Sequence, residues 1–462
     1  MKRDKISKLL GCGEDGQEVI VCGWVRTKRK SKGFSFLVVN DGSCQEVLQV
    51  VADESLATYS AVESAGTGAA IKVVGKLKAS PAKGQSWEVQ ALEVVLLGEA
   101  DATYPLQKKG HSLEFLREIA HLRPRTNTFG AMFRVRNTLS MAVHNFFQSR
   151  GFVWAHTPIL TAADGEGAGE MFSVTTLDLE GSLPKTDKKQ TDFAQDFFGK
   201  RAYLCVTGQL EGEFMAQSLG DIYTFGPTFR AENSNTYRHL AEFWMIEPEM
   251  AFADLADDMD LAEDFLKCLL RDVVNKCPAE LEFFEKMYKN IKVQELDDLA
   301  NCSFARVSYS EAVEILSKSG KKFEHPVNWG MDFNSEHERF LSEETFKKPV
   351  FVYDFPKDIK AFYMRCNDDG KTVAGMDLLV PKIGELIGGS QREERLDLLL
   401  KRMEEMKIPM DNLEWYIDLR RYGTAPHAGF GLGFERALLF ITGMQNIRDT
   451  LPCPRFPGHI EF

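Results

Sequence analysis

Arginine, glutamate, histidine and phenylalanine occur close together in two neighbouring segments of the 462-residue sequence, Phe229-Arg230-Ala231-Glu232 and His239-Leu240-Ala241-Glu242-Phe243. A guanidinium can hold one phosphate, an imidazole can reach another, and a phenyl ring can cover an adenine. The two segments would therefore suit ATP. An arginine next to a glutamate is also often a plain surface ion pair, so this spacing alone leaves both interpretations open.

A glycine-rich string near the end of the sequence, Gly429-Phe-Gly-Leu-Gly433-Phe-Glu-Arg436-Ala-Leu-Leu439, carries a further candidate residue. Glycines let the backbone approach a ligand closely. Arg436 falls where a helix is expected to open, and both its charge and the helix dipole favour a phosphate there. A single Gly-x-Gly is weak evidence, so the whole string carries the prediction.

Short β-rich runs fill the first hundred residues, with Gly, Asp and Ser at the breaks. Five such runs predict a small closed barrel, an OB-fold, over residues 1–103. Basic residues, Gly110 and Pro124 predict a hinge over 104–127. The expected strands are 19–25, 34–39, 47–51, 70–77 and 87–97.

The residues after the hinge, 128–462, are expected to form a mixed α+β domain that positions the candidate binding residues. Apolar residues at spacings of three and four predict helices, and short apolar runs predict strands. The polar stretch 180–200 predicts a loop or insertion, and 255–350 an inserted subdomain. The expected helices are 128–150, 255–274 and 392–406. The expected strands are 152–160, which Pro158 breaks, 350–354, 362–366 and 376–380, and a strand turns into a helix over 428–440.

Three segments of this domain, taken in order, resemble motifs 1, 2 and 3 of the class II aminoacyl-tRNA synthetases. They are the helix 128–150 with Thr157-Pro158-Ile159-Leu160, the stretch 229–243, and the glycine-rich string. The barrel, with Gly23-Trp24-Val25-Arg26, is similar to the anticodon-binding domain of the aspartyl, asparaginyl and lysyl subgroup. The resemblance implies an antiparallel catalytic sheet flanked by helices, and a homodimer formed through motif 1.

The same resemblance assigns roles in binding ATP. Arg230 would hold the α-phosphate and the amino-acid carboxylate, and Arg436 the γ-phosphate, so these two would serve catalysis. Asp377 and Glu385 resemble the carboxylates that hold Mg²⁺, which prefers a few carboxylates together with phosphate oxygens. Further ATP contacts would come from Glu232, His239, Leu240, Phe243 and Glu385.

For the amino acid, Arg392 resembles the arginine that binds the side-chain carbonyl of aspartate or asparagine, which disfavours lysine. Aspartyl enzymes typically carry a lysine where this sequence has Gly212. Glu247 would face the substrate amide, because an ionised carboxylate only accepts hydrogen bonds and would repel a second carboxylate. Glu166 and Gln209 would bind the α-amino group. The expected substrates are thus ATP, L-asparagine and tRNA(Asn), as in bacterial-type asparaginyl enzymes.

Three alternatives remain at this point. An aspartyl-tRNA synthetase, possibly one that charges both tRNAs, would be expected to carry the missing lysine. A free-standing ligase that makes asparagine would not need the barrel. A non-catalytic relative would be expected to have lost Arg230 and Arg436, which are present.

Contacts with tRNA are expected on the barrel. Phe36 and Gln49 lie on strands where this family stacks and hydrogen-bonds anticodon bases, and Arg26 and Arg29 could meet phosphates or base edges. Phe36 is equally suited to a barrel core. The net charge of −12 disfavours RNA, but residues 1–103 hold 13 basic and 13 acidic side chains and are neutral.

The remaining composition gives few constraints. No stretch approaches about 18 uninterrupted apolar residues, and Met1-Lys-Arg-Asp-Lys leads into no apolar signal-peptide core. The nine cysteines form no Cys-x-x-Cys pair. We therefore expect a cytoplasmic protein with reduced thiols and no membrane attachment.

Overall fold

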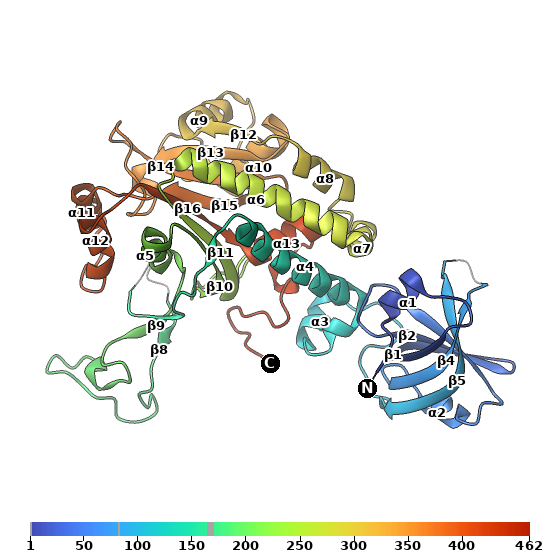
Figure 1. Ribbon diagram of the computed structural model, residues 1–462. Helices are drawn as coiled ribbons and strands as arrows, with labels where there is room; N and C mark the ends of the chain where they lie inside the picture. The colour runs from blue at the N-terminus through green and yellow to red at the C-terminus, as the bar shows by residue number, and fades with distance from the viewer. Residues whose placement is uncertain (1, 82–83, 164–170) are drawn as a thin grey trace. The chain divides into compact units, whose positions relative to one another are not determined.

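The computed structural model describes residues 2–81, 84–163 and 171–462 (Figure 1). The chain divides into two compact units, Met1–Arg134 with Phe462, and Val135–Glu461. None of the helices in the described ranges has the length and apolar character needed to cross a membrane.

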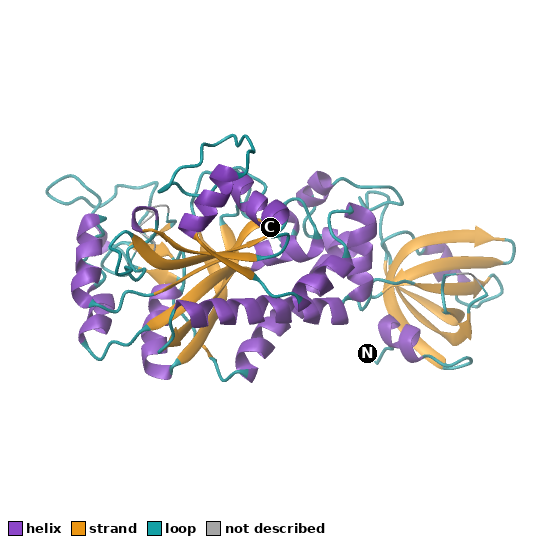
Figure 2. Ribbon diagram, turned by 90° about the horizontal axis from the view of Figure 1, so that it is seen from above, coloured by secondary structure: helices purple, strands orange, loops and turns teal. Residues whose placement is uncertain are grey.

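The first unit is built on a closed five-stranded barrel with neighbour order β1-β2-β3-β5-β4, and its strands curve around a common axis (Figure 2). Alternate residues of the strands point inward and form an aliphatic core, among them Val21, Leu37, Val50 and Val73. The five predicted strands and the OB-fold are confirmed. The elements are α1 (Ile6–Cys12), β1 (Glu18–Ser31), β2 (Phe34–Asn40), β3 (Leu48–Asp53), α2 (Tyr59–Ser64), β4 (Ala70–Ala79), β5 (Trp87–Gly98), α3 (Leu113–Glu118) and η1 (Arg123–Arg125).

The second unit is organised around an eight-stranded sheet with order β12-β13-β14-β15-β16-β11-β10-β6. Its neighbours pair antiparallel except at the two edges, where β12 and β6 are parallel to β13 and β10. The sheet strands are β6 (Val153–Trp154), β10 (Asp221–Phe229), β11 (Glu242–Ala251), β12 (Ala305–Ser308), β13 (Val350–Pro356), β14 (Thr372–Val380), β15 (Gly384–Gln391) and β16 (His427–Gly433).

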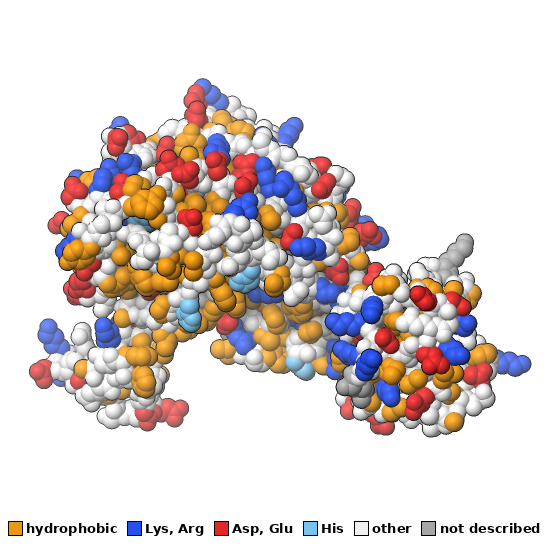
Figure 3. Space-filling model, viewed as in Figure 1, with side chains coloured by type: hydrophobic (Ala, Val, Ile, Leu, Met, Phe, Trp, Pro, Cys, Tyr) orange, Lys and Arg blue, Asp and Glu red, His pale blue; other side chains and the backbone are white. Residues whose placement is uncertain are grey.

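Helices flank this sheet, as predicted. The predicted helix 255–274 is α6, which packs against β14, β15 and β16, while α5 packs against β10 and β11. Acidic and basic side chains are interspersed over the face of this unit seen in Figure 3. The helices are α4 (Asn127–Ser149), α5 (Gln209–Leu219), α6 (Leu255–Lys276), α7 (Pro278–Tyr288), α8 (Val293–Asn301), α9 (Tyr309–Lys318), α10 (Ser335–Arg339), a π-helical turn η3 (Phe340–Thr345), α11 (Leu396–Glu405), α12 (Glu414–Arg421) and α13 (Phe434–Thr442).

A separate small sheet, β7-β9-β8, lies between α4 and α5 in the chain. It consists of β7 (Leu160–Thr161), β8 (Ser173–Val174) and β9 (Ala202–Leu204), and most of the polar stretch 180–200 forms turns, as predicted. Three short 3-10 turns complete the unit: η2 (Phe193–Gln195), η4 (Lys357–Ile359) and η5 (Ile447–Asp449).

The break predicted at Pro158 within the strand 152–160 is confirmed, because the run forms two strands, β6 and β7, in different sheets. Two other expected elements differ from the structure. The strand predicted over 362–366 is wrong, because Phe362 turns into an apolar cluster with α11 and α12 and only isolated pairings remain. The helix expected from Arg392 begins at Leu396, after residues held in buried ion pairs.

Candidate active site

A cavity of about 350 Å³ lies over β11, β14, β15 and β16 and beside the loop that joins β10 to β11. Every residue that the sequence assigned to ATP, the amino acid or the metal lines it, within the part of the chain that the structure describes. Glu166 falls outside the described residues. The assembled residues are Gln209, Arg230, Glu232, His239, Leu240, Phe243, Glu247, Asp377, Glu385, Arg392 and Arg436.

Glycines form part of the cavity floor. Across the sheet, Asp377 pairs with Gly388, and Gly388 pairs with Gly431. A Cβ at Gly388 would lie 3.1 Å from Glu385 Oε1 and 3.5 Å from Asp377 Oδ1. Residues paired across neighbouring strands share a face of the sheet. Gly388 and Gly431 therefore leave this face without two side chains next to Asp377. The sheet is hollowed beside the two carboxylates predicted to hold a cation.

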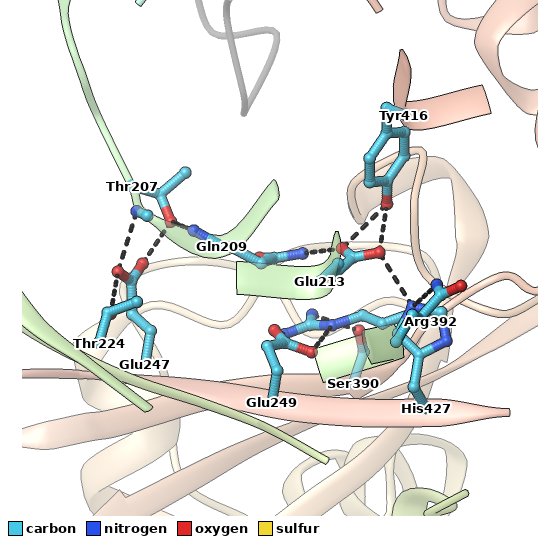
Figure 4. A network of polar contacts seen from close by, with 12 residues as sticks. Thr207, Gln209, Glu213, Thr224, Glu247, Glu249, Ser390, Arg392, Tyr416 and His427 are labelled. Carbon is cyan, nitrogen blue, oxygen red and sulfur yellow. Dashed lines mark hydrogen bonds and ion pairs between the residues drawn. The ribbon is translucent and has the colours of Figure 1, made fainter. Parts of the chain in front are cut away.

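At one end of the cavity, Arg392 is fixed by other protein groups (Figure 4). Its Nε donates to Glu249 at 3.2 Å, its second guanidinium nitrogen donates to the other oxygen of Glu249, and its third donates to Ser390 at 2.9 Å. Burial alone would lower the pKa of Arg392, but attraction to Glu249 and Glu213 raises it. Burial raises the pKa of Glu249 to about 7, although the two-point contact with Arg392 opposes that shift.

Behind this pair, Glu213 gathers four side chains, which Figure 4 shows in part. It accepts hydrogen bonds from Gln209 at 3.0 Å, from Tyr416 at 2.8 Å and from Arg420 at 2.7 Å, and His427 Nε2 lies 3.0 Å away. Burial would raise the pKa of Glu213, but Arg420 and His427 lower it. Glu213 therefore stays ionised, and it orients the amide of Gln209.

Glu247 lies on β11, two residues before Glu249, with its carboxylate turned to Thr207 and Gly208, which directly precede α5. It accepts a hydrogen bond from Thr207, one from Gly208 N at 2.9 Å and one from Thr224 at 3.0 Å. Protein donors thus satisfy much of its capacity. Its predicted contact with the substrate amide stays a prediction.

At the other end of the cavity, the β10–β11 hairpin presents its side chains beyond the last pair of the ladder. The last pair of the ladder is Phe229 and Glu242, so Arg230 is the first residue of the loop that joins β10 to β11. The Arg230 guanidinium lies 5.4 Å from the centroid of the Phe243 ring. His239 lies 4.0 Å from Glu232, and both are about two-fifths exposed. A flat ligand could stack on Phe243 while Arg230 meets its phosphate.

Arg436 is placed by the strand-to-helix junction of β16 and α13, as the sequence predicts. The preceding residue, Glu435, is buried and accepts a hydrogen bond from Trp244 N at 2.9 Å. It also pairs with Arg136 of α4 at 2.7 Å. These contacts fix the first turn of α13. Arg436 then donates to the carbonyl oxygen of Glu385 at 3.1 Å.

The two predicted metal ligands form an acidic cluster with Glu338 of α10. Glu338 accepts a hydrogen bond from Glu385 N at 3.2 Å. Burial and the neighbouring Glu385 raise the pKa of Glu338 to about 7 and, with Lys360 opposing, that of Asp377 to about 6. Burial therefore disfavours the charged form of Glu338 and Asp377 more than any neighbouring group does.

Comparison with known proteins agrees with this geometry. The family description "tRNA synthetases class II (D, K and N)" matches residues 112–457, and "OB-fold nucleic acid binding domain" matches 19–97. The chain belongs to the class II tRNA synthetases of the D, K and N group. The predicted resemblance is therefore confirmed.

Relatives within this synthetase family cover the whole chain. Asparagine–tRNA ligases of Synechocystis sp. and Oleidesulfovibrio alaskensis are each 59% identical over 100% of both chains. An asparaginyl-tRNA synthetase from Pyrococcus horikoshii, solved with asparaginyl-adenylate, is 31% identical, with a TM-score of 0.86 over 100% of this chain and 99% of that one. The resemblance to asparaginyl-tRNA synthetases, inferred from the sequence, is confirmed by these relatives.

The barrel of this synthetase brings together three of the four residues predicted to meet tRNA. Arg29 and Phe36 pair across β1 and β2, with the guanidinium 5.0 Å from the ring centroid. Gln49, on β3, donates to Glu88 at 3.1 Å. Phe36 lies between the buried Ser35 and Leu37 on the outer face, so it is not part of the core. Arg26 instead lines a second cavity beside the linker.

Several residues in or behind the cavity were missed from the sequence. Glu249 could have been found, because it lies two residues after Glu247 and strand side chains repeat with period two. His427 begins the strand that holds the glycine-rich string. No sequence pattern singles out the others, which are Glu213, Glu338, Lys360, Tyr416 and Arg420.

Proposed function

We propose that this protein is an asparagine–tRNA ligase, which activates L-asparagine with ATP and transfers it to tRNA(Asn). The observation that carries the proposal is the single cavity shared by the described residues assigned to both small substrates. The sequence identity to asparagine–tRNA ligases over the full chain supports it.

In the first step, a carboxylate oxygen of asparagine attacks the α-phosphorus, and the bond to the bridging oxygen of pyrophosphate breaks. Arg230 would stabilise the charge that builds on the α-phosphate, and Phe243 would stack on the adenine. In the second step, a terminal tRNA hydroxyl attacks the carbonyl carbon, AMP leaves with the electron pair, and the hydroxyl proton is released. Positioning and electrostatics serve this chemistry without a protein nucleophile.

The nucleotide would be held at the open end of the cavity. Arg436 would meet the γ-phosphate, His239 the outer phosphates and Glu232 the adenine amino group. Leu240, which also lines the cavity, would pack against the nucleotide. The side chains of Arg436 and His239 are partly exposed, which leaves them able to reach phosphate oxygens.

The other end would hold asparagine. Gln209 donates its amide hydrogen to Glu213, which leaves its oxygen for the substrate's ammonium group. Arg392 would meet the side-chain carbonyl, with Glu166 and Glu247 as further contacts. Arg392 and Arg420 already balance Glu249 and Glu213, so a neutral side chain enters without adding buried net charge, whereas aspartate would add one.

Mg²⁺ fits the acidic cluster, because Asp377 and Glu385 converge on the space above Gly388. Asp377 and Glu385 would hold it, and phosphate oxygens would complete its shell. When bound, the cation would neutralise charge on the phosphates.

For tRNA, we propose that an anticodon base stacks on Phe36, while Arg29 and Gln49 supply polar contacts, and that Arg26 meets phosphate. Phe36→Ala should raise the KM for tRNA about tenfold in aminoacylation, because stacking on an aromatic is worth about 1–3 kcal/mol per base. Asparagine-dependent exchange without tRNA should not change. Leu97→Ala, another exposed apolar residue of the barrel, is the matched control.

A homodimer is proposed through α4 and β6. The strand β6 ends the large sheet, and its Val153 and Trp154 are 41% and 57% exposed. Exposed apolar side chains on an edge strand favour burial against a second copy. Sedimentation analysis should give a dimer, and Trp154→Lys should shift it toward monomer. The cytoplasm stays the expected location.

The decisive experiment is ATP–pyrophosphate exchange without tRNA, with asparagine, aspartate and lysine in turn. Asparagine alone should support exchange, and Arg230→Ala should slow it about 10²–10³-fold. Exchange with aspartate instead would favour an aspartyl enzyme. Formation of free asparagine from aspartate and ammonia would favour the asparagine-making ligase, and no exchange at all would favour a non-catalytic relative.

A further inference from the structure

Lys360 lies inside the cavity and has no part in the proposed function so far. Its ammonium nitrogen is 2.7 Å from Asp377 Oδ2 and 3.9 Å from the centroid of the Phe355 ring. Only 15% of its side chain is exposed. A lysine held by a carboxylate and an aromatic face is a fixed charge at this position.

The contacts of Lys360 leave the other oxygen of its partner available. Asp377 Oδ1 is the oxygen that approaches the space above Gly388, where Glu385 Oε1 also points. Lys360 therefore holds the carboxylate by Oδ2 and turns Oδ1 toward the place proposed for the cation. The ammonium group of Lys360 therefore contacts the oxygen of Asp377 that is not aimed at the proposed cation site.

Each of the two proposed cation ligands already has a positive partner in the protein, while the third carboxyl group of the cluster, Glu338, accepts a hydrogen bond from Glu385 N. Lys360 neutralises Asp377, and Arg436 lies 3.7 Å from the carboxylate of Glu385. A divalent cation that approaches the two carboxylates alone meets two positive groups at the same time, so the net attraction is small. Phosphates change this balance, because they attract Arg436 away from Glu385 and bring oxygen ligands and negative charge of their own.

We propose that Lys360 is a positioning residue that makes metal binding depend on the nucleotide: its charge keeps Mg²⁺ from binding Asp377 and Glu385 until ATP brings it. This inference rests on the proposed function, in which these two carboxylates hold the cation with ATP. Arg436 gives way to the phosphates, whereas Lys360 stays on Asp377 and opposes binding of the metal alone.

The test is Mn²⁺ binding to the full-length protein, followed by electron paramagnetic resonance, with and without a non-hydrolysable ATP analogue. Wild type should bind Mn²⁺ weakly alone and tightly with the analogue. Lys360→Met and Lys360→Gln, which remove the charge, should bind nucleotide-free Mn²⁺ at least about tenfold more tightly than wild type. Lys360→Arg keeps the charge and should resemble wild type. Lys382→Met, which removes an exposed lysine paired with Glu295, is the matched control.

The outcomes separate the inference from the proposed function. If wild type binds Mn²⁺ tightly without the analogue, or if the neutral variants bind it no better than wild type, the role of Lys360 is overturned while the metal site stands. If wild type fails to bind Mn²⁺ even with the analogue, the metal role in the proposed function falls. Circular dichroism melts check folding, and the wild-type comparison holds even if a neutral variant does not fold.

Discussion

The two ends of the cavity hold their charges in opposite ways. At the asparagine end, the side chains of Arg392 and Glu249 are 3% and 1% exposed and paired with each other. At the nucleotide end, the side chains of His239, Glu232 and Arg436 are 43%, 42% and 34% exposed. Selecting a small neutral side chain requires charges fixed before it arrives, whereas gripping phosphates favours long side chains that can move to meet them.

The largest effect on stability is expected from a substitution at the buried end of the cavity. Arg392→Leu leaves the buried carboxyl group of Glu249 without its partner, which should lower the free energy of unfolding by about 3–5 kcal/mol and abolish exchange. Arg436→Leu, at the open end, should lower it by less than about 1 kcal/mol. Urea denaturation measures both. Equal losses of stability would contradict the contrast between the two ends.

Removal of Arg230, which is proposed to bind the α-phosphate, should affect the rate of exchange rather than folding. Arg230→Ala should slow asparagine-dependent exchange about 10²–10³-fold, because a donor aimed at developing charge is lost. The thermal melt should stay cooperative. A slower rate that is fully restored by saturating ATP would show that Arg230 binds ATP and the transition state equally well.

A smaller effect tests how the buried end orients its ligand. Glu213→Gln weakens the charged acceptor that holds Gln209, so the KM for asparagine should rise about tenfold. The KM for ATP should stay unchanged, because Glu213 does not line the cavity at the nucleotide end. Glu211→Gln, a carboxylate on the same helix, is the control. An equal rise in both KM values would point to general loosening instead.

The smallest effect concerns the adenine. Glu232→Ala removes one half-exposed acceptor and should raise the KM for ATP about fivefold, the cost of one hydrogen bond. The KM for asparagine is the internal control. A change in asparagine binding as large as the change for ATP would mean that the two ends are coupled.

The sequence predicted the open end better than the buried one. Arg230, Phe243 and Arg436 lie in contiguous segments whose order and spacing can be recognised in the sequence. The barrel strands can be recognised as well, because their apolar residues repeat with a period of two. The buried end depends on contacts between distant segments. Tyr416, Arg420 and His427 meet Glu213 across 203 to 214 residues of chain, and no local pattern marks such a meeting.

The segment 255–350 shows the same limit. The sequence carries no chemical signal there, yet β12 joins the large sheet and Glu338 reaches the acidic cluster. From the sequence alone, a glutamate on a short helix is expected to be exposed to solvent, so the burial of Glu338 could not be predicted. The strand expected over 362–366 failed for a related reason, since burial of Phe362 against α11 and α12 overrides its local preference.

Gly388 and Gly431 make the floor of the cavity a surface of main-chain atoms, so its shape is set by how β14, β15 and β16 are aligned. If β15 slid by one residue, each of its side chains would change face, and the buried Ile387 would stand where Gly388 now lies. A substitution far from the cavity that altered this alignment would block the enzyme with its own isoleucine, even though every binding residue was still present.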